Sequence, residues 1–437
     1  MTHTVLVIGA TDVGRRTCAA LQDRGTSVIH LASPTDTELR ELLLSDVSGV
    51  AIMLPNDIEA LRYALTIEHI RPGIRLFVAI FDRSVRHEME RTIPNCSIAS
   101  PAYIAIPSIV AAALLPHVSA LKRTGSTSDI TWEQVTLEDG SIQHDAFSIP
   151  SKWRRQRWSA ILRGQLRAYD SASRALLSGL MALVGMLLVD IVILQRHQSL
   201  PAAFYAASAV VAGVAAPDVP LSRWQFIQSG AFMLFTVIFV TTFGAGVVNH
   251  VLTGRRVGIV GRRTIPRKNH VIVVGLGQVG IRLCKELALL KIPVVAIEQV
   301  DTSRGVLFAR DLNIPVIIGN ASDVRTLRRA RVKHSRALLA MGSSEEDNIS
   351  VAVATRMLEP NTPIILRAGT NDAIEETRSL FAIGVVSDVN GLTAAFVCES
   401  LIGQPPHIVI SQDSAVDLVA HDYSVQRLPM PGRCICL

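Results

Sequence analysis

Two copies of a strand, glycine-turn and helix pattern lie near opposite ends of the chain and constrain its fold more than any other feature. In the second copy, the apolar run His270–Val274 leads into Gly275–Gly280, which has glycine at its first, third and last positions. In the first copy, Val5–Ile8 leads into Gly9–Gly14, which has glycine only at its first and last positions. Apolar strands that turn at closely spaced glycines into helices are typical of dinucleotide-binding folds. The alternation of strands and helices predicts two α/β domains of the Rossmann type, each with a doubly wound parallel sheet.

The second copy, which we place at residues 269–404, carries the complete glycine pattern. Gly275 allows the tight turn, Gly277 lets the backbone approach a pyrophosphate, and Gly280 allows close packing of the following helix. Glu298 ends the next predicted strand, where a carboxylate accepts hydrogen bonds from ribose hydroxyls and repels a 2′-phosphate. This copy is therefore predicted to bind NAD or an adenosine nucleotide, with NADP disfavoured.

The first copy, which we place at residues 1–119, departs from the pattern. Thr11 stands at the middle glycine position, and Ala32 stands where the second copy has Glu298. The first copy also lacks a stretch that corresponds to residues 300–321. A Cβ at the middle position crowds a pyrophosphate, and the ribose acceptor is absent. We therefore interpret the first copy as a structural or dimerising fold.

Between the two copies, two long apolar runs predict a pair of membrane spans within residues 171–252. Ala175–Leu194 is apolar except for two residues, and Gly230–Val248 carries no charge. Each run is about 20 residues long, which matches a hydrocarbon core of about 30 Å. Arg and Lys cluster at 152–174 and 255–268, outside both runs, so the positive-inside rule places both termini in the cytoplasm. The expected location is the inner cell membrane, with a multi-pass topology.

The loop between the two runs, residues 199–218, is predicted to enter the membrane and return on the same side. Its apolar body is short for a span and is bracketed by Pro201 and Pro217. A third span would also place one of the Rossmann-type domains outside the cell. Irregular backbone at membrane depth is tolerated where it is buried in protein or lines a watery cavity. Several subunits are therefore expected around this loop, and the expected assembly is a homotetramer in membrane lipid.

Charge and cysteine usage argue against other classes of protein. The chain has 43 Lys and Arg against 37 Asp and Glu, and its densest Arg clusters flank the apolar runs. This distribution favours membrane orientation over nucleic-acid binding. The six cysteines have no metal-binding spacing, and no nucleophile and base occur at a recognisable spacing. We therefore predict no metal site, no catalytic residue and no enzyme, although an NAD-dependent oxidoreductase stays an alternative that lacks an evident substrate domain.

Two further motifs follow in the second copy. Gly319-Asn320-Ala321 comes after the third predicted strand, and Ser343–Asn348 comes after the fourth. Together with the glycine turn, these motifs resemble the TrkA-N or RCK family, the regulators of potassium conductance. The family usually has Gly-Asp-Ala where this chain has Gly-Asn-Ala.

The resemblance implies that a nucleotide lies over the glycine turn, with Glu298 on its ribose and Asn320 near its adenosine end. The residues then expected to bind the cofactor are Gly275, Gly277, Gln278, Val279, Gly280, Glu298, Gly319, Asn320 and Ala321.

The apolar hairpin resembles the pore of a two-span potassium channel, with an outer helix, a pore helix, a filter and an inner helix. Ala203-Phe204-Tyr205 aligns with the pore helix, and Asp218 aligns with the acid that follows the filter. The family's filter is Thr-Val-Gly-Tyr-Gly, whereas Ala215 and Pro217 replace its glycines here. The resemblance implies a pore with an altered filter at Gly213, Val214, Ala215, Ala216, Pro217 and Asp218.

These features predict a nucleotide-regulated, potassium-channel-like membrane protein. Nucleotide binding would shift the RCK-like domains between two arrangements, and residues 253–268 would pass the shift to the inner helix. Residues 120–170 are expected to form a linker and juxtamembrane segment, and residues 405–437 a C-terminal tail. The altered filter supports an alternative function, a non-conducting membrane-anchored nucleotide sensor that regulates a partner cation transporter.

Overall fold

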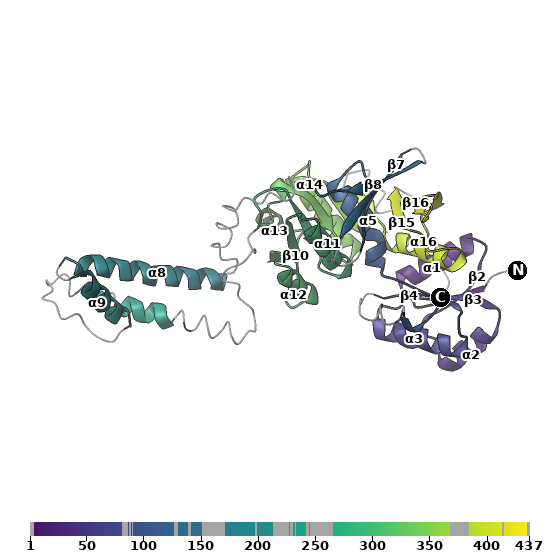
Figure 1. The fold of residues 1–437 in the computed structure, drawn as a ribbon, viewed down its shortest axis with the longest axis horizontal. Helices are drawn as coiled ribbons and strands as arrows, with labels where there is room; N and C mark the ends of the chain where they lie inside the picture. The colour runs from purple at the N-terminus through teal and green to yellow at the C-terminus, as the bar shows by residue number, and fades with distance from the viewer. Residues whose placement is uncertain are drawn as a thin grey trace. The chain divides into compact units, whose positions relative to one another are not determined.

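The computed structural model divides into two compact units, which are considered separately below (Figure 1). Residues 1–155 together with 265–437 form the first unit, and residues 156–264 form the second. The structure describes residues 4–80, 86, 89, 91–125, 130–138, 141–150, 171–196, 199–212, 227, 230–231, 233–241, 244, 265–367, 384–412 and 415–434. Both copies of the glycine-turn pattern lie in the first unit.

The N-terminal copy is built on a five-stranded parallel sheet with the strand order β2-β1-β3-β4-β5. Its strands are β1 (Thr4–Ile8), β2 (Ser27–Leu31), β3 (Val47–Ile52), β4 (Arg75–Ala79) and β5 (Cys96–Ala99). Its helices are α1 (Asp12–Asp23), α2 (Asp36–Leu44), α3 (Asp57–Ile70) and α5 (Pro101–Leu114). The central strands are nearly continuous buried apolar runs, as expected for a parallel sheet that is covered on both faces. Leu39 of α2 and Tyr63 of α3 are buried in the core on one of these faces.

The C-terminal copy has a six-stranded parallel sheet with the strand order β11-β10-β9-β12-β13-β14. The strands are β9 (His270–Val274), β10 (Val294–Glu298), β11 (Val316–Ile318), β12 (Ser335–Ala340), β13 (Ile364–Arg367) and β14 (Val385–Ser387). The helices are α11 (Gln278–Leu289), α12 (Arg304–Asp311), α13 (Val324–Arg329), α14 (Glu345–Leu358) and α16 (Val389–Ile402), with the 3-10 helix η1 (Val332–His334). The strand order reverses between β9 and β12. Ligands of open α/β sheets bind at such a switch point, outside the carboxyl ends of the strands.

The two sheets differ by one strand. In the C-terminal copy β10 lies between β9 and β11, whereas in the described part of the N-terminal copy its counterpart β2 is an edge strand. This difference agrees with the stretch opposite residues 300–321 that the first copy lacks in sequence. Both copies are Rossmann-like parallel α/β folds, as the sequence predicts.

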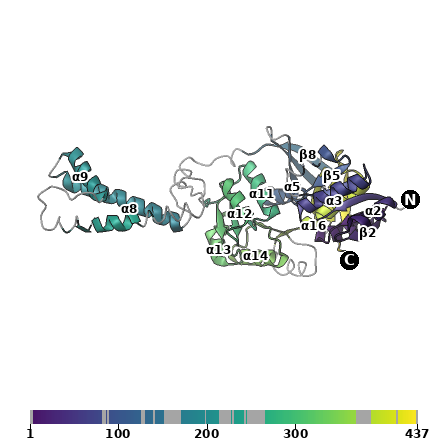
Figure 2. The ribbon, with the colours of Figure 1, turned by 90° about the horizontal axis from the view of Figure 1, so that it is seen from below.

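The two copies exchange their last helices. Helix α16 packs on α1, β3 and β4 of the N-terminal copy, and α5 packs on α11, β12 and β13 of the C-terminal copy. Figure 1 shows α16 beside α1, and Figure 2 shows α5 beside α11. Phe396 of α16 meets Phe77 of β4 edge to face, with ring centroids 6.0 Å apart. Because of this exchange, one hydrophobic core runs through both copies, which fits the structural role inferred for the first copy.

Each exchanged helix leads into a three-stranded antiparallel sheet. The first sheet consists of β6 (Ala120–Thr124), β7 (Thr131–Glu138) and β8 (Ser141–Phe147), and the second of β15 (Ile408–Gln412), β16 (Ala415–Val419) and β17 (Val425–Pro429). The sequence predicts a linker at residues 120–170 and a tail at residues 405–437, so both sheets are additions to that prediction. Ala120 and Val135 of the first sheet share a small core with Ile408, Ile410 and Val419 of the second.

The second unit contains α8 (Ser171–Leu194) and α9 (Leu200–Ala212), which lie side by side in Figures 1 and 2. Leu194 of α8 packs against Ala203 and Ala207 of α9. Among the described residues, no helix combines the length and the apolar character that a membrane crossing requires. The predicted filter at 213–218 lies outside the described residues, so the pore stays a prediction.

Candidate functional site

A cavity of about 700 Å³ lies at the carboxyl ends of the C-terminal strands. On the C-terminal side it is lined by the glycine turn at 275–279, by Glu298 and by residues 319–322. On the other side it is lined by the N-terminal copy, at residues 11–13 and 53–55. The volume falls in the range of about 300–1,000 Å³ that is usual for small-molecule sites. The two copies therefore form one shared site.

Each glycine of the turn has its own structural reason. Gly275 has a φ of +83°, and an added Cβ would lie 2.8 Å from the backbone nitrogen of Gly342. A Cβ on Gly280 would collide with the carbonyl oxygen of Gly275. Gly280 therefore packs behind the turn and, unlike the other predicted cofactor residues, does not line the cavity. Gly277 has no protein atom within 4 Å of an added Cβ, so its outer side is open space that a ligand could enter.

The first turns of α1 and α11 differ in how their amides are satisfied. At α1, Oγ1 of Thr11 accepts a hydrogen bond from the amide of Gly14 at 3.2 Å and donates to the carbonyl oxygen of Met53 at 2.8 Å. At α11, the N-cap residue is Gly277, which provides no side-chain cap. The first amides of a helix have no partner within the helix, and together with the helix dipole they favour an anion. The first amides of α11 are therefore available to an anion at the cavity. In α1, one of the corresponding amides already donates its hydrogen bond to the side chain of Thr11.

The carboxylate of Glu298 is fixed beside the glycine turn. Its Oε2 accepts a hydrogen bond from the amide of Leu276 at 2.7 Å, and its Oε1 accepts one from the amide of Gln299 at 2.8 Å. An ionised carboxylate has about four acceptor sites. Glu298 can therefore hold the turn and still accept hydrogen bonds from ribose hydroxyls.

The loop after β11 carries the three residues predicted at the adenosine end. Gly319 has a φ of +152°, a conformation that residues with a Cβ rarely adopt. The Oδ1 atom of Asn320 accepts hydrogen bonds from the amide and the hydroxyl of Ser322, both at 2.9 Å. The side chain of Ala321 is buried at the cavity wall. Because Oδ1 of Asn320 is engaged in this turn, its NH₂ group is the part suited to a ligand.

Two residues that the sequence analysis did not assign to the site also shape it. The Oδ1 atom of Asn348 accepts a hydrogen bond from the amide of Gly342 at 2.9 Å, and its Nδ2 donates to the carbonyl oxygen of Arg367 at 2.7 Å. These bonds tie together the ends of β12 and β13. A Cβ on Gly305 would collide with the carbonyl oxygen of Leu276, so α12 packs tightly against the glycine turn. The motif that ends at Asn348 was the sequence signal for this region.

Arg367 is the basic residue among those that line the cavity. Burial lowers the pKa of its guanidinium, and the charges of Glu345, Asp388 and Asp12 act in the opposite direction. Arginine stays protonated under ordinary conditions, so the lining of the cavity includes one cation together with the acidic residues Asp12, Glu298 and Asp347. Within the described residues, no group of three or more His, Cys, Asp or Glu side chains is placed to hold a metal ion.

The sequence of the C-terminal copy matches a known domain. Residues 271–388 match the profile of the TrkA-N domain. This segment of the chain is a TrkA-N domain. It extends from β9 to the cap of α16, and therefore includes the glycine turn, Glu298 and the loop after β11.

Proteins similar to part of this chain include archaeal potassium channel proteins. Potassium channel protein 1 of Methanocaldococcus jannaschii is 27% identical over 100 residues, which are 23% of this chain and 30% of the relative. Probable potassium channel protein 2 of the same organism is 29% identical over 136 residues, which are 30% of this chain and 39% of the relative. The chain thus spans less than half the length of these curated relatives, and the similarity shows homology within that part.

The fold is similar to solved structures of the GsuK channel. The GsuK RCK domain superposes with a TM-score of 0.50 at 11% identity, covering 92% of this chain and 77% of that one. The GsuK channel bound to NAD gives a TM-score of 0.50 at 11% identity, covering 92% of this chain and 64% of that one. At such low identity the likeness shows the fold alone, and the RCK-like fold predicted from the sequence is confirmed.

Proposed function

We propose that this protein is a nucleotide-regulated, potassium-channel-like protein of the inner cell membrane, with both termini in the cytoplasm. The TrkA-N domain is its sensor, and residues 171–252 form a two-span, pore-like hairpin with a re-entrant loop. The subunits assemble as a homotetramer around that loop. The homology to potassium channel proteins and the fold shared with GsuK support this proposal, and it assigns no catalytic step to the cavity.

One observation carries the assignment of the ligand. Gly277, which begins the uncapped first turn of α11 and has open space beside it, and the basic residue Arg367 line the same cavity. Amides at a helix N-terminus and a guanidinium are the groups that bind phosphates in proteins. Glu298 adds a ribose acceptor and a negative charge that disfavours a 2′-phosphate. The ligand is NAD or an adenosine nucleotide.

The shared cavity supplies a route for regulation. In chain order, residues 156–264 lie between the two copies that line it. A ligand that fits one arrangement of the copies better than another shifts the population toward that arrangement. Such a shift acts on both chain ends of the second unit, where the chain enters it at residue 156 and leaves it at residue 264.

Binding measurements test the ligand assignment. Calorimetric titration of the purified full-length protein is expected to detect NAD and ADP, and to give a weaker affinity for NADP. The variant Gly277→Asp places a carboxylate in the open space and is expected to remove binding by repelling the phosphates. Its matched control, Ile58→Asp, adds the same charge to an exposed position in the first turn of α3 and should bind like the wild type. Failure of the wild-type protein to bind any of these nucleotides overturns the assignment.

The altered filter favours a second candidate function, a non-conducting membrane-anchored sensor that regulates a partner cation transporter. Ala215 and Pro217 replace the glycines whose backbone conformations a potassium filter uses. The two candidates differ in flux through the isolated protein. Potassium flux from liposomes that contain only this protein supports the channel, whereas nucleotide binding without flux, together with recovery of a cation transporter in a pull-down, supports the sensor.

A further inference from the structure

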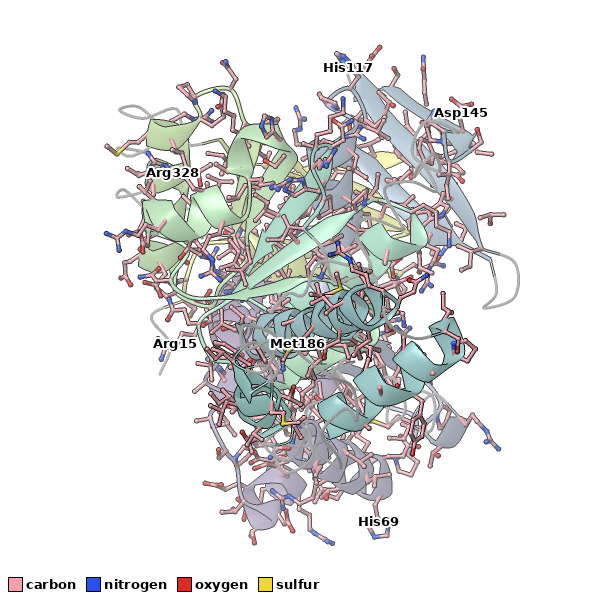
Figure 3. All side chains as sticks on the ribbon, turned by 90° about the vertical axis from the view of Figure 1, so that its left-hand side faces the viewer. Arg15, His69, His117, Asp145, Met186 and Arg328 are labelled. Atoms are coloured by element: carbon pink, nitrogen blue, oxygen red, sulfur yellow. The ribbon has the colours of Figure 1, made fainter. Side chains whose placement is uncertain are left out.

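A second concave surface of about 520 Å³ lies on the C-terminal copy, and we call it the basic pocket. Five basic residues line it together with two apolar ones; the basic residues are Arg267, Arg328, Arg331, Lys333 and His334. They come from the segment before β9, from the end of α13, and from η1 with its cap. Arg328 is labelled in Figure 3, among the helices of the C-terminal copy.

The basic pocket is separate from the nucleotide cavity. His334 directly precedes β12, and its carbonyl oxygen accepts a hydrogen bond from the amide of Asn269, which directly precedes β9. The basic pocket therefore lies at the amino ends of these strands, whereas the nucleotide cavity lies at their carboxyl ends. None of the described residues lines both.

Within the part of the chain that the structure describes, the positive charge in the basic pocket has no acidic partner. Among the described residues, no Asp or Glu lines the pocket, and none of the five basic side chains forms an ion pair. The basic residues also affect the pKa of the buried imidazole of His270. Burial is the main cause that lowers the pKa of His270, and Arg331 and His334 lower it further. Like charges held together without a counter-ion favour the binding of an anion.

The backbone that carries these side chains is firmly held. Arg331 has a φ of 57° and a ψ of 47°, a left-handed conformation that is uncommon for a residue with a Cβ. Nε2 of His270 donates a hydrogen bond to the carbonyl oxygen of Ala330 at 2.8 Å, and Oγ of Ser335 donates to that of Val332 at 2.7 Å. The backbone of this turn is therefore fixed before a ligand binds, and less conformational entropy is lost on binding.

We propose that the basic pocket binds a phosphate-bearing polyanion. Arg and Lys are the side chains that bind phosphate groups, Arg by paired hydrogen bonds and Lys as a point charge. Several such groups around one concave surface suit a ligand with adjacent phosphates. Two sources share this chemistry, a free polyphosphate and the headgroup of an anionic phospholipid. The proposal does not depend on the nucleotide site.

A titration with inorganic tripolyphosphate tests the pocket in the full-length protein. The double variant Arg328→Gln/Lys333→Gln removes two exposed charges of the pocket and should weaken binding by about tenfold or more. The matched control Arg325→Gln/Arg329→Gln removes two exposed charges from α13 that do not line the pocket. The control should change affinity by less than about threefold. Equal losses in both variants would show diffuse surface charge and overturn the proposal.

Labelling of lysine identifies the source of the anion. The rate at which an amine-reactive reagent modifies Lys333 is compared with that of Lys291, an exposed lysine outside the pocket. Slower modification of Lys333 alone in tripolyphosphate supports a free anion. Slower modification of Lys333 alone in nanodiscs of phosphatidylcholine with phosphatidylglycerol, compared with phosphatidylcholine only, supports a lipid headgroup. Unchanged modification of Lys333 in both experiments contradicts the proposal.

Discussion

Arg16 of α1 and Asp388, the cap of α16, form a buried ion pair, with 2.6 Å between Nη1 and Oδ2. Each side chain is 3% exposed, and the two residues belong to different copies of the Rossmann-like fold. Nε of Arg16 also pairs with Oδ2 of Asp12 at 3.0 Å. Asp388 accepts a further hydrogen bond from the amide of Gly391 at 2.9 Å, within its own helix. The pair therefore joins the start of the exchanged helix to the glycine-turn helix of the other copy.

Loss of one partner of this pair should be strongly destabilising. Arg16→Met removes the cation whose Nη1 lies 2.6 Å from the buried carboxylate of Asp388, and loss of one partner of a buried ion pair costs about 3–5 kcal/mol. The measurement is the denaturant midpoint of the purified protein. The control Arg62→Met breaks an exposed pair with Asp36, whose side chains are 53% and 67% exposed, and should cost about 1 kcal/mol or less.

A second substitution distinguishes the loss of this charge pairing from a simple packing defect. In Arg16→Met/Asp388→Asn the charge is absent, and the Asn side chain can still cap α16. This double variant should be more stable than Arg16→Met. A double variant that is no more stable would contradict the role assigned to the ion pair.

Glu298 should control the discrimination between NAD and NADP. Glu298→Gln keeps an acceptor for the amide of Leu276 but removes the negative charge, so the repulsion of a 2′-phosphate disappears. The ratio of NADP to NAD dissociation constants should fall by about tenfold, which corresponds to about 1.4 kcal/mol. Calorimetric titration gives both constants. The matched control Glu346→Gln removes a charge from the first turn of α14, and an equal effect of both variants would refute the assignment.

The two small antiparallel sheets are joined by a hydrogen-bonded chain through His407. Nζ of Lys122 donates to Nδ1 of His407 at 3.0 Å, and Nε2 of His407 donates to Glu133 at 3.2 Å. Tyr423 donates to the other oxygen of Glu133 at 2.7 Å. Burial lowers the pKa of Lys122 to about 8, so its ammonium is mostly protonated near neutral pH. The imidazole of His407 is then neutral, with its hydrogen on Nε2.

The hydrogen bonds around His407 predict that the folded protein loses stability in mild acid. Burial, followed by the charge of Lys122, lowers the pKa of His407. As the pH falls below about 6.5, the imidazole therefore becomes protonated in the unfolded protein before it does so in the folded protein. The free energy of unfolding decreases over this range, down to the lower pKa of His407 in the folded state. His407→Gln should reduce the drop in denaturant midpoint between about pH 7.5 and pH 5.5, whereas the exposed control His69→Gln should not. An unchanged drop in His407→Gln would contradict this account.

The local features of the fold could be predicted from the sequence, because they depend on neighbouring residues. The glycines at 275, 277 and 280 and the acid at Glu298 mark the turn and the rim of the cavity, and the missing stretch after Ala32 agrees with the smaller first sheet. Asn348 and Arg367 were harder to assign, since their roles depend on two strand ends that meet only in the folded sheet.

The exchange of α5 and α16 could not be predicted in the same way. Both helices are apolar on nearly all sides, which indicates burial on more than one face but does not identify the partner. The strands of 120–147 and 408–429 are short, and they become a stable pair of sheets only by packing on the exchanged helices and on each other. The shared cavity follows from the same long-range contacts.

The most direct test of the central claim is potassium flux from liposomes that contain the purified protein, measured with and without NAD. The account predicts that NAD changes the flux of the wild-type protein and has no effect on the flux of Gly277→Asp. Potassium flux that stays the same in the wild-type protein while NAD is bound would contradict it.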